Sequence, residues 1–273
     1  MISKKIGFIG LGEIGKPMAI SVLKQGFDLT VLGHIRPEPV EELRGLGAKV
    51  ALSPAELAQT SDFIITIVRD TSQTEQVIFG EQGLCEGIKP GTILIVMSTH
   101  EYQFILDLPH RMEAKGVSVL DAPVSGGTRG AEQGALTIMV GGEEKTFEEC
   151  RPLFEAMGKN IFYIGSIGSG MIAKLVNNLI MAVSLSGVKE ALSLGAKAGI
   201  DPKVLLEVVK VSTGRSQVAE NYWNRYEPRI KNGSLLVGKD LKAGLELASQ
   251  IGVELPVVSL ISHLDFGRLA RQE

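Results

Sequence analysis

Residues 5–15 read Lys-Ile-Gly-Phe-Ile-Gly-Leu-Gly-Glu-Ile-Gly, and this stretch decides the fold. Its first five residues form a short apolar run that is typical of a buried strand. The glycines at positions 10, 12 and 15 then make a Gly-x-Gly-x-x-Gly turn, and apolar residues recur at helical spacing from Ile14 to Gln25. A glycine-rich turn between a buried strand and a helix is the fingerprint of a dinucleotide-binding βαβ unit.

The three glycines of this turn have separate roles in such a unit. Gly10 allows the tight turn, Gly12 lets the backbone approach a pyrophosphate, and Gly15 lets the helix pack on the strand. The exposed backbone N–H groups and the dipole of the helix favour the diphosphate. A plain structural turn is the alternative, but the flanking strand and helix favour a nicotinamide dinucleotide site formed by Gly10, Leu11, Gly12, Glu13, Ile14 and Gly15.

The end of the second predicted strand bears on the choice of cofactor. An acidic residue about 20 residues after the glycines binds the ribose hydroxyls and favours NAD. Here residues 32–36 read Leu-Gly-His-Ile-Arg, and no acid occurs before Glu38. A site with His34 and Arg36 can accept a 2′-phosphate, which Arg36 would hold through paired hydrogen bonds, unless Arg36 is a solvated loop residue. We therefore predict NADP(H) as the cofactor, with NAD still possible.

Strand-like and helix-like segments alternate through the first half of the chain. The further strand candidates are short apolar runs, at residues 29–32, 50–52, 63–68, 92–97, 117–120 and 136–140. Residues 53–56, Ser-Pro-Ala-Glu, predict a helix start. After Gly165 the pattern becomes helical, with one long helix over residues 177–199. The predicted architecture is α/β: an N-terminal Rossmann domain with a parallel sheet over residues 1–165, then an all-α domain over residues 166–273.

Composition and charge exclude some classes of partner. The chain has 273 residues, of which 44% are hydrophobic and 22% charged, and its formal net charge is −3. This balance is ordinary for a globular protein and predicts no general attraction to nucleic acid or to an anionic membrane. The apolar stretch 175–194 contains Asn177, Asn178, Lys189 and Glu190, which favours a buried helix over a membrane span.

The cysteines predict neither a metal site nor a disulfide framework. Cys85 and Cys150 are isolated from each other and from any Cys or His cluster, so we expect no metal. Two isolated cysteines and the absence of a signal-peptide pattern predict a cytoplasmic location, although a disulfide between them is conceivable.

Two further segments carry polar groups suited to a substrate. Residues 121–127 read Asp-Ala-Pro-Val-Ser-Gly-Gly, and backbone N–H groups around Ser125, Gly126 and Gly127 can hold a carboxylate as an anion nest. A plain loop is the alternative. Farther on, Lys174 and Asn178 are four residues apart and share one helix face among apolar neighbours. Lys174 therefore either extends to solvent or faces a cleft as a proton-transfer group, and the residues alone leave both open.

Four segments, in order along nearly the whole chain, resemble motifs of the β-hydroxyacid dehydrogenases, the family of 3-hydroxyisobutyrate dehydrogenase and of related semialdehyde and glyoxylate reductases. They are residues 7–15, residues 121–127, residues 168–178 and the run Lys239-Asp240-Leu241. The resemblance implies a Rossmann domain, a long connecting helix, an all-helical second domain and an active site in the cleft between them.

The resemblance also implies roles for individual residues. Lys174 would be the general acid in reduction and the base in oxidation, with Asn178 orienting the substrate beside it. The substrate would contact Ser125, Gly126, Gly127 and Asn177. The cofactor would contact Val68 and Arg69 near its adenosine, and Ser98, Thr99 and Lys239 near its nicotinamide. No metal takes part in this scheme.

The predicted activity follows from this resemblance. It is an NADP(H)-dependent interconversion of a small 3-hydroxy acid and its semialdehyde, or the reduction of a small aldehyde or keto acid such as glyoxylate or succinic semialdehyde. One alternative is an imine reductase, which Lys174 disfavours because the resemblance implies a different residue at that position in imine reductases. The other is a non-catalytic NADP-binding module. The expected partners are a small carboxylate-bearing substrate and further copies of the chain, as a homodimer or homotetramer, without nucleic acid or membrane.

Overall fold

The structure, a computed structural model, describes residues 4–33, 37–231 and 238–264. The chain divides into two compact units, residues 1–174 and residues 175–273. The division falls within one long helix, whose first turns belong to the first unit. The boundary expected at residues 165/166 from sequence stays a prediction.

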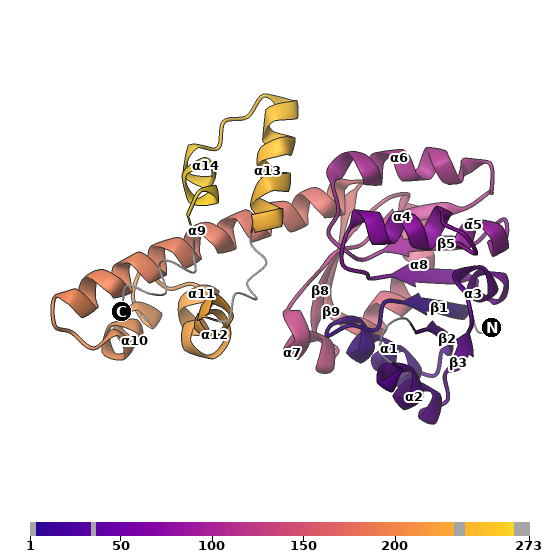
Figure 1. Ribbon diagram of the computed structural model, residues 1–273, viewed down its shortest axis with the longest axis horizontal. Helices are drawn as coiled ribbons and strands as arrows, with labels where there is room; N and C mark the ends of the chain where they lie inside the picture. Colours follow the sequence, from indigo (N-terminus) through magenta and orange to yellow (C-terminus); the bar gives the residue numbers. More distant parts are fainter. Residues whose placement is uncertain (1–3, 34–36, 232–237, 265–273) are drawn as a thin grey trace. The chain divides into compact units, whose positions relative to one another are not determined.

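A mostly parallel sheet forms the centre of the first unit (Figure 1). Six parallel strands lie in the order β3-β2-β1-β4-β5-β6. Their bounds are β1 (Lys5–Ile9), β2 (Asp28–Leu32), β3 (Lys49–Ala51), β4 (Phe63–Thr66), β5 (Ile93–Val96) and β6 (Ser118–Asp121). This is the doubly wound order of dinucleotide-binding domains, and the order reverses between β1 and β4. The predicted fold class is thus confirmed.

The edge of the sheet beyond β6 differs from the fully parallel expectation. β8 (Leu136–Gly141) runs antiparallel to β6 and to the short β7 (Val124–Ser125). β9 (Gly158–Gly165), which the sequence pattern did not predict, pairs with β8 in parallel. Chain length accounts for the antiparallel pairing of β7 with β8, because a parallel crossover needs about a dozen residues or more and only residues 126–135 connect these two strands.

Helices cover both faces of this sheet because successive strand residues point to opposite sides. Ile6, Phe8 and Ile65 join one core, under α1 (Gly15–Lys24), α2 (Glu38–Gly45), α7 (Gly127–Glu132) and α8 (Glu144–Met157). Ile64 and Leu94 join the other, under α3 (Pro54–Thr60), α4 (Thr71–Phe79), α5 (Leu84–Gly87) and α6 (Tyr102–Glu113). Figure 1 shows α4 and α6 above the strands and α1 and α2 below them.

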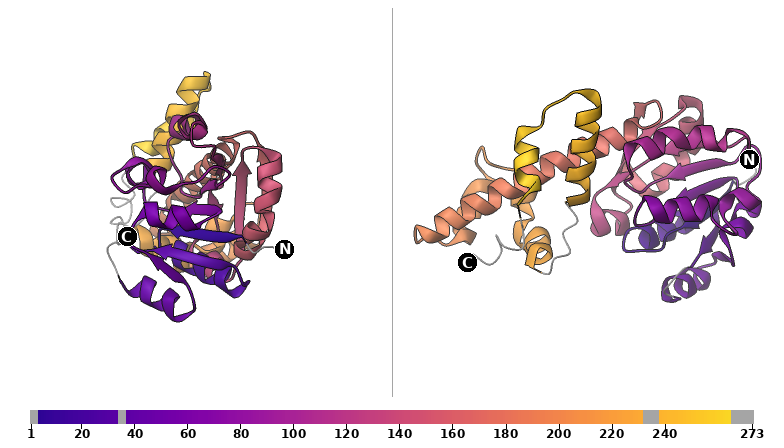
Figure 2. Two further views of the ribbon diagram at one scale, coloured as in Figure 1. Left: turned by 90° about the vertical axis from the view of Figure 1, so that its right-hand side faces the viewer. Right: turned by 45° about the horizontal axis from the view of Figure 1, so that its top comes forward.

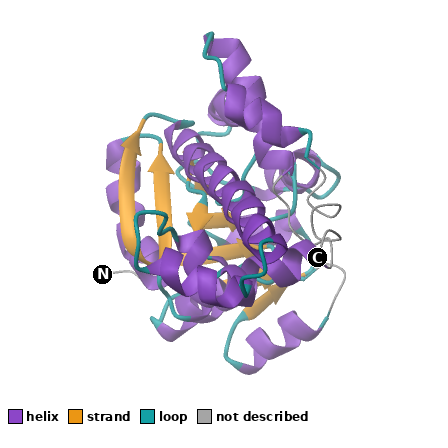
Figure 3. Cartoon of the chain, turned by 90° about the vertical axis from the view of Figure 1, so that its left-hand side faces the viewer, coloured by secondary structure: helices purple, strands orange, loops and turns teal. Residues whose placement is uncertain are grey.

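The second unit is built on α9 (Ser169–Lys197), and its described residues contain no strand, as Figure 3 shows. One core joins α9 to α10 (Pro202–Lys210), α11 (Gln217–Glu220), the π-helix η1 (Tyr222–Tyr226) and α12 (Glu227–Lys231). Another joins the middle of α9 to α13 (Gly238–Ile251) and α14 (Pro256–Ser262), which lie beside it in Figures 1 and 2. The helical second part of the chain was predicted correctly, but α9 begins at Ser169, well before residue 177.

Among the described residues, α9 is the one helix that is long and apolar enough to cross a membrane by length and composition alone. Its side chains nevertheless enter packed cores. Met171 belongs to a core of the first unit, and Ala182 and Leu185 belong to the two cores of the second. We therefore interpret α9 as a core helix that supports both units.

Candidate active site

The three glycines of the turn after β1 occupy the places that a dinucleotide site requires. Gly10 has φ +106°, and a Cβ there would collide with the carbonyl oxygen of Ile67. A Cβ on Gly15 would collide with the carbonyl oxygen of Gly10, so α1 packs closely on the turn. At Gly12, in contrast, a Cβ would meet no protein atom within 4 Å. The missing side chain of Gly12 therefore leaves open space, which fits the approach of a diphosphate.

The start of α1 can bind an anion. Its N-cap residue, Ile14, supplies no side-chain hydrogen bond, and the first turn contains no acidic residue. Its first backbone N–H groups thus have no capping side chain, and the positive end of the helix dipole faces the turn. Glu13 and Gly12 are exposed, and Leu11 and Ile14 are half-buried. These residues fit a dinucleotide.

The structure brings two more of the predicted cofactor residues to the same edge of the sheet. Val68 follows β4 and Ser98 follows β5, and the Ser98 hydroxyl donates to the Val68 carbonyl oxygen at 2.7 Å. In a doubly wound sheet, ligands bind at the carboxyl ends of the strands where the strand order reverses, here at β1 and β4. Thr99 is half-buried beside Ser98, and Arg69 is exposed beside Val68. His34 and Arg36 lie outside the described residues.

The candidate carboxylate-binding segment adopts a conformation that only glycines take readily. Gly126 has φ +129° and Gly127 has φ +65°. Ser125 ends β7, and Gly127 begins the short helix α7. Ser125, Gly126 and Gly127 are all half-buried. The segment is therefore a turn between two elements whose positive φ angles glycine adopts without steric cost, and it offers backbone N–H groups and the Ser125 hydroxyl to an anion.

Asp121 joins this segment to the helix that carries Lys174. It is fully buried at the end of β6. Its Oδ1 accepts from the Gly168 N–H and its Oδ2 from the Met171 N–H, each at 2.7 Å. Burial raises the pKa of Asp121 to about 6, although these backbone hydrogen bonds oppose the rise. Lys174, half-buried on α9, follows Met171 by about one helical turn.

The two asparagines predicted to contact substrate are linked to α13 within the second unit. Asn178 is buried, and its Nδ2 donates to Asp240 Oδ2 at 2.8 Å. Asn178 Oδ1 accepts from Asn177 Nδ2 at 3.0 Å. Both ends of the Asn178 carboxamide thus have protein partners, and Asn177 is the more exposed of the pair. Lys239, next to Asp240, is exposed on α13.

Sequence reasoning missed the structural roles of Asp121, Asp240 and His100. His100 is buried, its Nε2 lies 3.1 Å from Thr74 Oγ1, and its backbone N–H donates to Met171 Sδ at 3.4 Å. One signal was present for Asp121: an acidic residue directly after the apolar pair Val119-Leu120 at the end of a predicted strand. The described parts of the chain contain no group of three or more His, Cys, Asp or Glu side chains placed to hold a metal ion.

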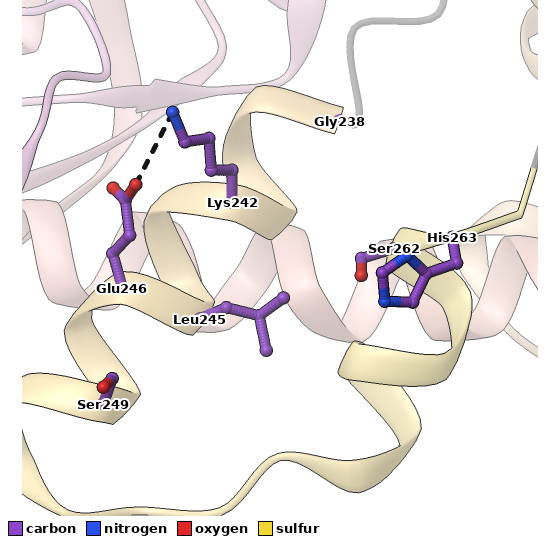
Figure 4. A pocket seen from close by; sticks show the side chains of 7 residues that line it. All are labelled: Gly238, Lys242, Leu245, Glu246, Ser249, Ser262 and His263. Carbon is purple, nitrogen blue, oxygen red and sulfur yellow. Dashed lines mark ion pairs between the residues drawn. The ribbon is translucent and has the colours of Figure 1, made fainter.

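An open hollow of about 440 Å³ lies between α13 and α14 of the second unit (Figure 4). Lys242 and Glu246 line it and point toward each other, with Nζ and Oε1 3.6 Å apart. Its remaining lining is Gly238, Leu245, Ser249, Ser262 and His263. Lys242 and Glu246 therefore pair with each other, and we do not assign a ligand to this hollow.

Comparisons with known proteins match both parts of the chain. Residues 5–165 match the model of the NAD-binding domain of 6-phosphogluconate dehydrogenase. Residues 168–270 match the model described as NAD-binding of NADP-dependent 3-hydroxyisobutyrate dehydrogenase.

Relatives of known name match over nearly the whole chain. A probable mitochondrial 3-hydroxyisobutyrate dehydrogenase of Dictyostelium discoideum is 38% identical, covering 93% of this chain and 82% of the relative. An NAD-dependent L-serine dehydrogenase of Pseudomonas aeruginosa is also 38% identical, with 94% and 89% covered. The crystal structure of 3-hydroxyisobutyrate dehydrogenase from Salmonella typhimurium has a TM-score of 0.86 at 27% identity, over 98% of this chain and 99% of that one. The chain therefore belongs to the family of NAD(P)-dependent β-hydroxyacid dehydrogenases that includes 3-hydroxyisobutyrate dehydrogenase.

Proposed function

We propose that the chain oxidises a small 3-hydroxy acid to its semialdehyde and catalyses the reverse reduction, with NADP(H) as cofactor and Lys174 as general acid and base. One observation carries this proposal: Asp121 ties the start of the helix that bears Lys174 to the strand end that leads into Ser125, Gly126 and Gly127. Asp121 thereby connects the helix that carries the Lys174 ammonium group with the segment that leads into the proposed carboxylate-binding turn.

The chemistry assigned to these residues is proton transfer and anion binding. The nicotinamide, when bound, accepts the hydride in oxidation and returns it in reduction. In oxidation, neutral Lys174 takes the proton of the substrate hydroxyl; in reduction, its ammonium donates a proton to the carbonyl oxygen, where negative charge develops. The turn at Ser125, Gly126 and Gly127 holds the substrate carboxylate, and Asn177 and Asn178 orient the substrate.

The relatives suggest the substrate class. 3-Hydroxyisobutyrate and L-serine, the substrates in the relatives' names, both carry a hydroxymethyl group on the carbon next to the carboxylate. A carboxylate-binding turn and a lysine would supply one group for the acid and one for the alcohol of such a substrate. We propose a 2-substituted 3-hydroxypropanoate as substrate, with glyoxylate and succinic semialdehyde as the alternative acids to be tested.

Removal of Lys174 tests the proposed mechanism. Lys174→Ala should lower kcat by about 10²–10⁴-fold, the usual contribution of general acid–base catalysis, because no other group takes the proton. Binding of NADPH, followed by its fluorescence, should stay as in the wild type. Lys197→Ala, which removes an exposed lysine from the same helix, should keep normal turnover. Normal turnover by Lys174→Ala would refute the role of Lys174.

The choice of cofactor rests on the acid-free run from Gly33 to Arg36. The second family model is described as NADP-dependent, whereas the Pseudomonas aeruginosa relative is named NAD-dependent. We expect kcat/KM to be higher with NADPH than with NADH, and Arg36→Ala to lower that ratio while activity with NADH is retained. A preference for NADH in the wild type would contradict the proposal.

A substrate panel separates the competing functions. NADPH oxidation is followed optically with methylmalonate semialdehyde, glyoxylate, succinic semialdehyde and a cyclic imine, and NADP⁺ reduction with 3-hydroxyisobutyrate and L-serine. Turnover of the imine alone would indicate an imine reductase, and tight NADPH binding without any turnover would indicate a non-catalytic module.

We also propose a cytoplasmic location, which the two free thiols of Cys85 and Cys150 support.

A further inference from the structure

Asp121 is a buried carboxyl that the proposed reaction does not use. It has no exposed surface, and it hydrogen-bonds through both oxygens to the backbone at Gly168 and Met171. Gly168 directly precedes α9 and Met171 lies in its first turn, where a carboxylate also interacts favourably with the helix dipole. The side chain therefore fixes the first turn of α9 against the end of β6.

Two glycines lie directly against this carboxyl. A Cβ on Gly170 would lie 2.8 Å from Asp121 Oδ2, and a Cβ on Gly141 would collide with Asp121 Oδ1. Gly141 is also the residue that pairs with Asp121 across the sheet, where the strand direction changes. Two glycines thus lie against the carboxyl, and a side chain at either position would displace it.

A second contact holds the same turn. Met171 is fully buried, and its sulfur accepts the backbone N–H of His100, the residue after Thr99. Met171 is therefore held through its backbone by Asp121 and through its side chain by the chain that follows β5. Lys174 comes one helical turn later, and so its backbone position depends on these two contacts.

The carboxyl has an energetic cost that a structural cap would avoid. Burial raises the pKa of Asp121 to about 6, so ionising this carboxyl costs more free energy here than in water, although the carboxylate still predominates at pH 7. Neutral Ser, Thr and Asn satisfy helix N-termini without a charge. A neutral side chain could therefore cap this helix without the free-energy cost of a buried carboxylate.

We propose that Asp121 is a positioning residue for Lys174, which sets where the lysine lies relative to the Ser125–Gly127 turn. This inference rests on the proposed role of Lys174. Asp121 itself touches neither substrate nor cofactor. It acts by holding one end of α9 to the strand that leads into the turn.

The test is Asp121→Asn, which keeps the shape of the side chain and places an amide where one N–H needs an acceptor. Its fold should be retained, since the neutral side chain removes the cost of the buried charge. We expect kcat to fall about 10–100-fold, as for a reacting group displaced by about 1 Å, while the Kd for NADPH changes less than about twofold. The solvent deuterium isotope effect on kcat should rise, because proton transfer becomes slower relative to the other steps.

The matched control is Asp201→Asn. Asp201 caps α10 by accepting the Lys203 N–H at 2.8 Å, and it is exposed and outside the proposed machinery. Its kcat and isotope effect should equal those of the wild type. In Asp121→Asn, an unchanged kcat would overturn the proposal. So would a lower kcat with an unchanged isotope effect, because a smaller folded fraction produces that result.

Two further variants keep the outcomes distinct. Met171→Leu preserves the side-chain volume and removes only the sulfur acceptor, so it should fold. Compared with Asp121→Asn, it should lose less kcat, and its solvent isotope effect should also rise. It decides the matter if Asp121→Asn does not fold, and wild-type values in it would then overturn the proposal. Full activity of Lys174→Ala would refute the proposed function itself. An inactive Lys174→Ala beside a fully active Asp121→Asn would refute the positioning role alone.

Discussion

At the scale of a single residue, a substitution at Gly12 should weaken cofactor binding without lowering the stability of the fold. Its φ lies outside the left-handed region, and a Cβ there meets no protein atom within 4 Å. Gly12→Ala should therefore leave the free energy of unfolding unchanged or raise it by up to about 1 kcal/mol. The added methyl group should weaken NADPH binding by at least about tenfold, or ~1.4 kcal/mol, because it occupies the place of the diphosphate.

Fluorescence titration and urea unfolding check this prediction. Gly45→Ala is the matched control, since a Cβ at Gly45, the last residue of α2, also meets no atom within 4 Å. That variant should bind NADPH normally. Equal affinity in the Gly12 and Gly45 variants would show that the diphosphate does not lie at the turn.

Asp121 makes stability depend on pH. Its folded pKa of about 6 lies above its ordinary value of 3.8, so the folded state binds the proton more tightly than the unfolded chain does. The protonated carboxyl therefore contributes stability at low pH, and this contribution is lost as the pH rises through about 6. Relative to Asp121→Asn, the wild type should lose about 1 kcal/mol of unfolding free energy between pH 5 and pH 8. Urea unfolding of both proteins measures this; a difference that is constant or that grows with pH contradicts it.

At the scale of elements, the hydrogen bond from Asn178 to Asp240 joins α9 to α13. The two helices approach closely, since a Cβ on Gly244 would lie 2.8 Å from the Leu179 side chain. Asp240→Ala leaves the buried Asn178 amide without this acceptor, so it should lower the free energy of unfolding by about 1–3 kcal/mol.

The measurement is urea unfolding followed by the fluorescence of Trp223, the single tryptophan of the chain, which lies in the second unit. Lys242→Ala, on an exposed part of α13, is the control and should change stability by less than about 0.5 kcal/mol. If both variants unfold at the same urea concentration, the link between the helices does not contribute to stability.

At the scale of the whole molecule, we expect a homodimer or homotetramer. Ile180, Val183 and Leu194 lie on one face of α9 and are 63%, 36% and 74% exposed. Apolar side chains gathered on one helix face mark an interaction surface, and a second copy of the chain is the partner that we propose. Sedimentation equilibrium should show a mass at least twice that of the 29.3 kDa chain.

Charge on this face should break the assembly. Ile180→Glu should shift the protein toward the monomer, because a buried unpaired carboxylate opposes association. Lys197→Glu, an exposed change on the same helix, should leave the mass unchanged. A wild-type protein that sediments as a monomer would refute the prediction.

Local patterns predicted most of the strands. The strand candidate at residues 63–68 became β4, and the candidate at residues 92–97 became β5. The predicted helix start at residues 53–56 is also confirmed, because Ser53 Oγ accepts the Glu56 N–H at 3.1 Å. Periods of two and of 3.6 residues, and caps three residues apart, are properties of short segments. They can therefore be recognised without knowledge of the rest of the fold.

The errors concern features that depend on distant partners. β9 has mostly exposed side chains and pairs at the sheet edge, so its residues show no clean alternation. Apolar periodicity gave the long helix as residues 177–199, whereas α9 begins at Ser169, and Asp121 binds its first turn from 50 residues away in the chain.

The sequence by itself determined the glycine turn at residues 10–15, the alternation of strands and helices in the first half of the chain, and the residue types suited to the proposed chemistry. Only the tertiary structure decided that Gly12 faces open space, that Asp121 holds the turn before Lys174, and that Asp240 accepts a hydrogen bond from the Asn178 amide. The physical reason is the range of the interactions. Helix and strand periodicity is set by backbone geometry over about a dozen residues, whereas the partner of a buried polar group is chosen by chain closure, here across 50 and 62 residues.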